Sequence, residues 1–373
     1  MCFTSNQNLQ KYVSNNMKLI RTFHPVGHGA FYTERFFNKC GKNVFNMVYD
    51  CGSLTESVNL HTIIDNEFQN DETIDLLFVS HFHADHVNGV MELARKCHVR
   101  YLVFPSVLIN DNELLFCEYL HNIYITKNVN NTANQLIEAC FHDDIDFEKN
   151  NRHQADATCF FRKDKKTILL SSDKLVLTKS QNFPKWKWEY LPFCCINKPI
   201  NAKTIFSDLT TKYPKLKNNL SFGSFFAGIR DFFKNNRNII ELKELYKPYY
   251  QNDNYYSMTV LSKSTKMDTN RASCLYTGDF PSRNKKCLNQ LKNYYSKDWN
   301  DIFVLQVPHH GSGLDNPPAL HNVQSRDCVI SYGPNKRLSH PHKETLMNIA
   351  LSKSMIHLVN EDKNSTYQIT FDF

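Results

Sequence analysis

Short apolar runs with the length and spacing of β-strands recur along the first hundred residues. Residues 18–26, 31–37 and 44–49 alternate or cluster apolar side chains as strands do. Residues 74–80, IDLLFVS, form a nearly continuous apolar run, which is typical of a strand buried on both faces. The first part of the chain is therefore expected to build a sheet.

Helical patterns follow these strands. Residues 58–68 and 90–97 carry apolar side chains at helical spacing, and residues 100–104 predict the next strand. Strands that are followed by alternating helices and strands predict an α/β fold, in which layers of helix cover sheet.

The middle of the chain has a different character. Two helices are expected within residues 113–142, and residues 156–162 and 166–171 predict a hairpin. Residues 180–252 are rich in Lys, Asn and aromatic residues, with helical patterning in their second half. We interpret residues 180–252 as a helical insertion within a single domain that spans residues 1–373.

Strand and helix signals return after this insertion. The chain again alternates short apolar runs with segments of helical period, as an α/β fold requires. The expected strands are 257–262, 272–276, 302–307, 329–332 and 367–371, and the expected helices are 287–294 and 343–351.

Composition sets broad limits on the class of protein. Hydrophobic residues make up 41% of the 373 positions, which is enough for a sizeable core and argues against a disordered chain. The formal net charge of +7 is compatible with an anionic substrate such as a nucleic acid or phosphodiester. A composition rich in Lys and Asn accounts for the same charge, so the charge alone selects no substrate.

The cellular setting is suggested by the N-terminus and the cysteines. The first sixteen residues are polar and do not resemble a secretory signal, and no apolar run is long enough to cross a bilayer. The 12 cysteines follow no repeating frame. Buried free thiols in a reducing compartment explain them better than disulfides do. We expect a cytoplasmic protein that does not bind a membrane.

The candidate chemistry is concentrated directly after the apolar run of residues 74–80. His81, His83, Asp85 and His86 fall within six consecutive positions. Imidazole suits zinc, iron or manganese, and carboxylate widens that choice. Two ions about 3.5–4 Å apart can share a hydroxide. A histidine-rich surface loop is the alternative, but later residues complete the pattern.

Other histidines and tryptophans allow two interpretations. We expect His121, His142 and His153 to be surface or capping residues, whereas His28 either lines the site or is structural. Trp186 and Trp188 alternate with lysines, which fits a stacking platform for single-stranded nucleic acid. An amphipathic strand gives the same alternation, and we favour the interpretation that the tryptophans lie in the core.

At this point the sequence resembles a known family. Residues 81–86, HFHADH, match the H-x-H-x-D-H signature of the metallo-β-lactamase superfamily, and Thr277-Gly278-Asp279 resembles its bridging aspartate. Residues 307–312, VPHHGS, and 339–342, SHPH, narrow the resemblance to the competence-type (ComEC-like) hydrolase domains of bacteria. That resemblance implies a four-layer αββα sandwich with the metals at one edge.

The resemblance also implies roles for individual residues. His81 and His83 would bind metal one, Asp85 and His86 would bind metal two, and Asp279 would bridge both. His340 is assigned to metal two by its distance in sequence from Asp279. His309 or His310 would then donate a proton or contact the transition state, and the spacing also permits the reverse assignment.

One departure from the family pattern concerns metal one. The superfamily usually supplies a third histidine before the strands that lead to the bridging aspartate, and residues 252–257 contain none. Asn254 would then ligate weakly through its amide oxygen. Metal one is expected to be weak or to bind only with substrate, and a single-metal enzyme stays an alternative.

The expected activity is hydrolysis that depends on two divalent metal ions, zinc or manganese. A metal-bound water deprotonated near neutral pH would attack phosphorus or a carbonyl carbon, with His309, His310 or His342 protonating the leaving oxygen. The first hypothesis is a phosphodiesterase or nuclease. The alternatives are a hydrolase of lactones, thioesters or β-lactams, or a regulatory subunit of a defence module with an ATPase or protease partner.

Overall fold

The structure is a computed structural model of the 373-residue chain. Its longest described stretches are residues 17–105, 257–264, 272–323, 325–333 and 340–373. Shorter described pieces are 119–123, 126, 134–135, 157–163, 166–170, 175–177, 188–195, 202–212, 214 and 240–241. Most of the second half of the expected insertion lies outside the described residues, as do Asn254, His142, His153 and Trp186.

The first sheet has eight strands in the order β17-β1-β2-β3-β5-β7-β8-β9. Neighbours pair antiparallel except around β5, which runs parallel to both β3 and β7. The strands are β1 (Lys18–Phe23), β2 (Gly29–Phe37), β3 (Asn43–Ser53), β5 (Leu76–Phe78), β7 (Tyr101–Pro105), β8 (Ala157–Lys163), β9 (Lys166–Leu170) and β17 (Tyr367–Asp372).

The second sheet has seven strands in the order of the chain, from β10 to β16. Its first four strands pair antiparallel, and the remainder, from β13 to β16, pair parallel. The strands are β10 (Leu175–Leu177), β11 (Trp188–Cys194), β12 (Met258–Ser264), β13 (Cys274–Tyr276), β14 (Val304–Gln306), β15 (Asp327–Ser331) and β16 (Met355–Val359). Two short strands, β4 (Thr73–Ile74) and β6 (His98–Val99), pair separately.

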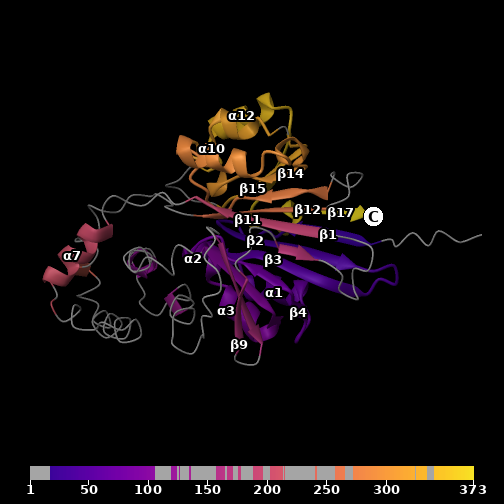
Figure 1. The fold of residues 1–373 in the computed structure, drawn as a ribbon, viewed down its shortest axis with the longest axis horizontal. Helices are drawn as coiled ribbons and strands as arrows, with labels where there is room; N and C mark the ends of the chain where they lie inside the picture. Colours follow the sequence, from indigo (N-terminus) through magenta and orange to yellow (C-terminus); the bar gives the residue numbers. More distant parts are fainter. Residues whose placement is uncertain are drawn as a thin grey trace, which may run out of the picture.

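Helices cover the outer face of each sheet, so the molecule has four layers. Figure 1 shows α10 and α12 on one side of the paired sheets and α1, α2 and α3 on the other. The first-sheet helices are α1 (Leu60–Glu67), α2 (Ala84–Val87) and α3 (Val90–Lys96). The second-sheet helices are α10 (Lys285–Tyr294), α11 (Pro318–His321) and α12 (Lys343–Leu351), and α7 (Ala202–Lys212) lies apart. The αββα sandwich expected from the sequence is confirmed.

Helix ends follow local sequence signals. The Asn59 side chain accepts a hydrogen bond from the Thr62 amide at 3.1 Å and caps α1. The Asn284 side chain accepts bonds from the Lys286 and Cys287 amides and caps α10. Asparagine is among the preferred N-cap residues because its oxygen satisfies amides that have no partner within the helix.

The core between the sheets is aromatic and contains one buried ion pair. The rings of Tyr49 and Tyr276, from opposite sheets, stack with centroids 5.0 Å apart. The Arg21 guanidinium lies 2.6 Å from the Glu34 carboxylate, and both side chains are fully buried. Tyr190 and Tyr276 donate hydroxyl hydrogen bonds to the same carboxylate at 2.9 Å, so the charge is compensated where the sheets meet.

The expected strands and helices outside the insertion largely match the observed ones. Strands β10 and β16 and the short helices α2 and α11 were not predicted. The expectation that the cysteines are free thiols is wrong for one pair, because Cys195 at the end of β11 is disulfide-bonded to Cys287 of α10. Trp188 is fully buried within β11, as the core interpretation predicts. No helix among the described residues is both long and apolar enough to cross a membrane.

Candidate metal centre

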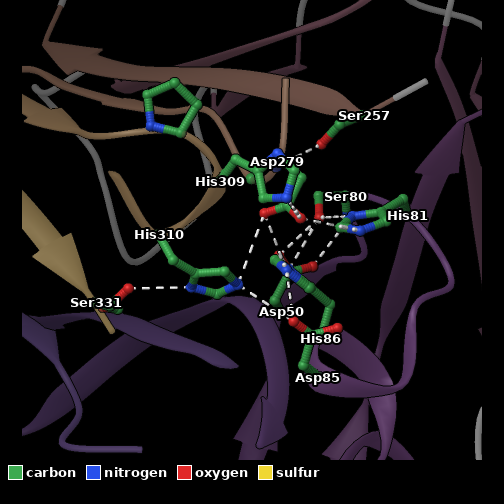
Figure 2. Close-up of polar contacts among 12 residues, drawn as sticks. Asp50, Ser80, His81, Asp85, His86, Ser257, Asp279, His309, His310 and Ser331 are labelled. Atoms are coloured by element: carbon green, nitrogen blue, oxygen red, sulfur yellow. Dashed lines mark hydrogen bonds and ion pairs between the residues drawn. The ribbon is translucent and has the colours of Figure 1, made fainter. Parts of the chain in front are cut away.

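The site forms where parallel strands of both sheets end. Strand β5 leads into His81, α2 follows at Ala84, β13 leads into Asp279, and β14 leads into His309. The carboxyl ends of parallel strands meet at one edge of their sheet. In this fold, that edge of the first sheet faces the corresponding edge of the second. Figure 2 shows the resulting cluster of imidazole and carboxylate groups.

The loop after β5 directs two histidines and a carboxylate inward. His81 is buried, and its Nδ1 lies 2.9 Å from the Ser80 hydroxyl. Its Nε2 has no hydrogen-bond partner among the described residues and lies 3.8 Å from Asp279 Oδ2. Asp85 and His86 fall in the helical turn of α2, and the His86 ring lies beside that of His81, with centroids 4.2 Å apart. His86 Nε2 then lies 3.2 Å from Asp279 Oδ1 and 3.7 Å from Asp85 Oδ2.

Asp50, near the end of β3, fixes the orientation of His86. Its carboxylate accepts hydrogen bonds from the Ser80 amide and hydroxyl at 2.7 Å and from His86 Nδ1 at 2.7 Å. Asp50 is fully buried and has a left-handed backbone, with φ of 55°. A histidine that donates Nδ1–H to a carboxylate presents its Nε2 lone pair to a metal.

Asp279 is presented by a tight turn after β13. Gly278 has φ of 52°, and a Cβ there would lie 2.6 Å from Ser257 Oγ and 2.7 Å from Ser80. The turn therefore needs glycine. The Asp279 amide donates to the Ser257 hydroxyl at 3.0 Å, and its carboxylate faces the histidines of the first sheet.

His309 and His310 enter from the opposite side, and both have positive φ, 51° and 52°. His310 donates Nδ1–H to the Ser331 carbonyl at 3.0 Å, and its Nε2 lies 3.1 Å from Asp85 Oδ2. His309 donates Nδ1–H to Asp315 at 2.7 Å, and its Nε2 lies 3.9 Å from Asp279 Oδ2.

Among the residues that the structure describes, three groups of side chains could hold a metal ion. In each group, one ligand atom per residue lies within 4.8 Å of the others. The groups are His81, His83 and Asp279; His86, Asp279 and His310; and His28, Asp85 and His310. The donor chemistry fits divalent metals, because carboxylate oxygens and imidazole nitrogens converge and the Nδ1 atoms of His86 and His310 are engaged by acceptors behind them.

The charges of this cluster are strongly coupled. Burial opposes ionisation of Asp85 and Asp279, yet nearby histidines, chiefly His86, hold the pKa of both carboxyls well below the usual range. Burial lowers the pKa of His86, but Asp279, Asp85 and Asp50 outweigh that effect and raise it. Such an arrangement of anionic carboxylates is suited to a cation.

The remaining predicted residues lie farther from this cluster. His340 is half-buried, and its ring centroid lies 6.0 Å from that of His309. The His342 side chain is 40% exposed, and its Nδ1 lies 3.9 Å from Glu344. Neither belongs to a potential metal group among the described residues. Asn254, the suggested weak ligand, lies outside the described residues.

Two other histidines line the site. His28, whose role the sequence left open, lies 3.5 Å from Asp85 Oδ2, and its ring centroid is 4.4 Å from that of His310. His121 was expected at the surface or at a cap, and that expectation is wrong. Its half-buried ring stacks on His83, because the helical segment around residue 121 folds back over the metal loop.

Comparison with known protein families matches the part of the chain that carries the metal loop. Residues 44–167 match the model of the metallo-beta-lactamase superfamily. Residues 44–167 therefore carry a metallo-β-lactamase superfamily domain.

Two relatives and one solved structure are similar to it. ComE operon protein 3 of Bacillus subtilis (strain 168) is 30% identical over 106 residues, which cover 28% of this chain and 13% of that protein. Anti-Pycsar protein Apyc1 of Paenibacillus sp. (strain J14) is 35% identical over 72 residues, 18% of this chain and 27% of that protein. The crystal structure of unliganded yeast PDE1 aligns with a TM-score of 0.39 at 9% identity, covering 95% of this chain and 99% of that one.

Proposed function

We propose that the protein is a metal-dependent phosphodiesterase that acts on a nucleic acid or another phosphodiester. The observation that carries this proposal is the position of Asp85 and Asp279. Histidine Nε2 atoms of both sheets surround the two carboxylates, at 3.1 Å for His310 and 3.2 Å for His86. This donor set suits the paired metal sites of phosphoryl-transfer enzymes.

The proposed ligand assignment follows the observed groups. His81, His83 and Asp279 would hold metal one, and Asp85, His86, His310 and Asp279 would hold metal two. His310 takes the place that the sequence resemblance gave to His340, because its Nε2 is oriented toward both carboxylates. Two bound ions, zinc or manganese, would supply Lewis acidity and lower the pKa of a coordinated water toward neutrality.

His309 is the proposed proton donor to the leaving oxygen. Its Nδ1–H is held by Asp315, so its Nε2 faces the cluster at Asp279. Burial lowers the pKa of His309, but Asp279 and Asp315 outweigh that effect and raise it, which keeps a proton available. A buried acid oriented by a carboxylate is the arrangement that general acid catalysis needs.

The testing experiment measures bound metal and cleavage in one preparation. The protein is incubated with single- and double-stranded DNA, RNA and bis-p-nitrophenyl phosphate, with added manganese or zinc. Asp279→Asn and His83→Ala run beside it, and His61→Ala, an exposed histidine of α1, is the matched control. We expect cleavage that needs metal, is lost in the first two variants and survives in the control.

Bound metal without cleavage of any phosphodiester would contradict the proposal. Hydrolysis of a lactone, thioester or β-lactam by the same preparation would then identify a carbonyl hydrolase. A chain that retains a protein partner, such as an ATPase, after Asp85→Ala and that cleaves neither class would be a regulatory subunit.

A further inference from the structure

The helical segment of residues 119–123 lies against the loop that carries the candidate metal ligands. Asn122 donates a hydrogen bond from its side-chain Nδ2 to the backbone carbonyl of Phe82 at 2.8 Å. Asn122 is 1% exposed, and Phe82 is fully buried. Because Phe82 stands between His81 and His83, this bond fixes the backbone from which both ligands extend.

The next contact involves His83 itself. The ring of His121 stacks on the ring of His83, with centroids 4.2 Å apart and an angle of 17° between the planes. The His83 ring also meets His81 in an edge contact, with centroids 4.5 Å apart. His83 thus contacts two rings that come from different parts of the chain.

The near-parallel stack distinguishes two roles for His121. Two imidazoles that share one ion direct their nitrogens at a common point, so their planes converge on it. Rings that face each other at 4.2 Å direct their nitrogens along parallel lines instead. In agreement with this, the described group around metal one contains His83 but not His121. The ring of His121 therefore acts on His83 and not on the metal.

Contacts from behind orient several histidines of this cluster. Hydrogen bonds to rigid elements hold His86 at Asp50 and His310 at the Ser331 carbonyl, and the stack on His121 is a further contact of this kind for His83. Metal one is approached by only two histidines among the described residues, together with the shared Asp279. With so few ligands, its affinity depends strongly on the orientation of each one.

We propose that His121 and Asn122 are positioning residues that hold His83 and the Phe82 carbonyl in place and thereby set the affinity of metal one. This inference rests on the proposed metal site but not on the identity of the substrate. It assigns a role to the described segment of residues 119–123, none of which belongs to a potential metal group among the described residues.

The test compares His121→Ala, His121→Phe and Asn122→Ala with the wild type and His61→Ala. The readouts are zinc bound per chain, zinc affinity by competition with a chelator, and the absorption spectrum of the cobalt-substituted protein. Removal of a residue that orients a ligand costs about 10–100-fold in metal affinity. We expect His121→Ala and Asn122→Ala to lower the affinity for one of the two ions by that factor, while the other ion stays bound. His121→Phe keeps a flat ring that can stack on His83. We expect its zinc affinity to lie within about 3-fold of the wild-type value, a smaller change than the loss of an orienting residue causes.

Two results would overturn the inference. If His121→Phe loses metal as severely as His121→Ala while it remains folded by circular dichroism, the imidazole nitrogen is needed and His121 is a ligand. If both variants bind metal as the wild type does, the stack has no role in the site. Two bound ions in a wild-type chain that cleaves no phosphodiester would overturn only the proposed function. A wild type that takes up no metal would overturn the inference together with the metal site.

Discussion

The side chain of Gln306 binds both backbone polar groups of Gly278. Gln306 Oε1 accepts the Gly278 amide at 2.7 Å, and Gln306 Nε2 donates to the Gly278 carbonyl at 3.3 Å. The same Oε1 accepts the Thr277 amide at 2.6 Å. Gln306 ends β14 and is buried, so one amide from a neighbouring strand fixes the turn that presents Asp279.

This relationship predicts the effect of Gln306→Leu. The variant leaves the Thr277 and Gly278 amides buried without that acceptor, and each unsatisfied group costs about 1–3 kcal/mol. We expect a lower free energy of unfolding and loss of bound metal, measured by urea denaturation and metal analysis. Gln69→Leu, at an exposed position after α1, is the matched control and should change neither. Retention of full metal content by folded Gln306→Leu would show that Asp279 is positioned without this amide.

Asp315 should affect turnover through His309. Asp315→Asn removes the carboxylate that receives His309 Nδ1–H, so His309 loses its orientation and its proton affinity. We expect kcat for bis-p-nitrophenyl phosphate to fall by about 100-fold with little change in KM, since general acid catalysis contributes about 10²–10⁴-fold.

A double-mutant cycle tests whether Asp315 acts on turnover through His309. His309→Ala should lose at least as much activity, and adding Asp315→Asn to it should cost almost nothing further, because both changes remove one function. Losses that multiply in the double variant would mean that Asp315 acts independently of His309.

The pH dependence of stability should report on His24, which lies away from the metal cluster. Burial, with a smaller effect of Arg35, lowers the pKa of His24 to about 3. Its ordinary value is 6.5, so the unfolded chain binds this proton first as the pH falls. Stability that His24 contributes is present above pH 6.5 and is lost progressively toward pH 3.

The measurement compares wild type and His24→Gln by urea denaturation at pH 7.5 and pH 5. The wild type should lose more stability than the variant over this interval, because glutamine does not titrate. Parallel pH profiles for the two proteins would exclude a buried neutral His24.

The Cys195–Cys287 disulfide predicts sensitivity to reductants. It closes a sequence separation of 92 residues and joins β11 to α10. Loss of a disulfide typically costs about 2–5 kcal/mol. Dithiothreitol should therefore lower the melting temperature of the wild type, and the doubly substituted Cys195→Ser, Cys287→Ser protein should already show that lower value. Cys40→Ser, at an exposed free thiol, is the control. An unchanged melting temperature under reduction would contradict a contribution of this bond.

The parts of the fold that could be predicted from sequence are those with local signals. Apolar runs and turn residues located β5, β12 and α12, and the spacing of His81 to His86 identified the metal loop. Strand β16 was missed because it lies at the edge of its sheet. Its Met355 and Leu358 are exposed, so burial neither alternates nor runs continuously along it.

The relationships that sequence could not reveal join distant positions. His121 lies 38 positions after His83, and only the fold brings the two rings together. The partner of Cys195 was equally inaccessible, because spacing does not determine disulfide connectivity. The choice between His310 and His340 near the carboxylates depended on the direction of a side chain after a left-handed turn, which a motif does not encode.

The candidate site takes its side chains from both sheets, His81 to His86 from one and Asp279 to His310 from the other. Among the described residues, neither half of the chain supplies all the candidate ligands. During synthesis, the nascent chain acquires the site only after most of it has left the ribosome and the two sheets have docked. Partly folded or truncated chains would be inactive. Metal would bind only to the folded molecule, and this binding would stabilise the native state against unfolding.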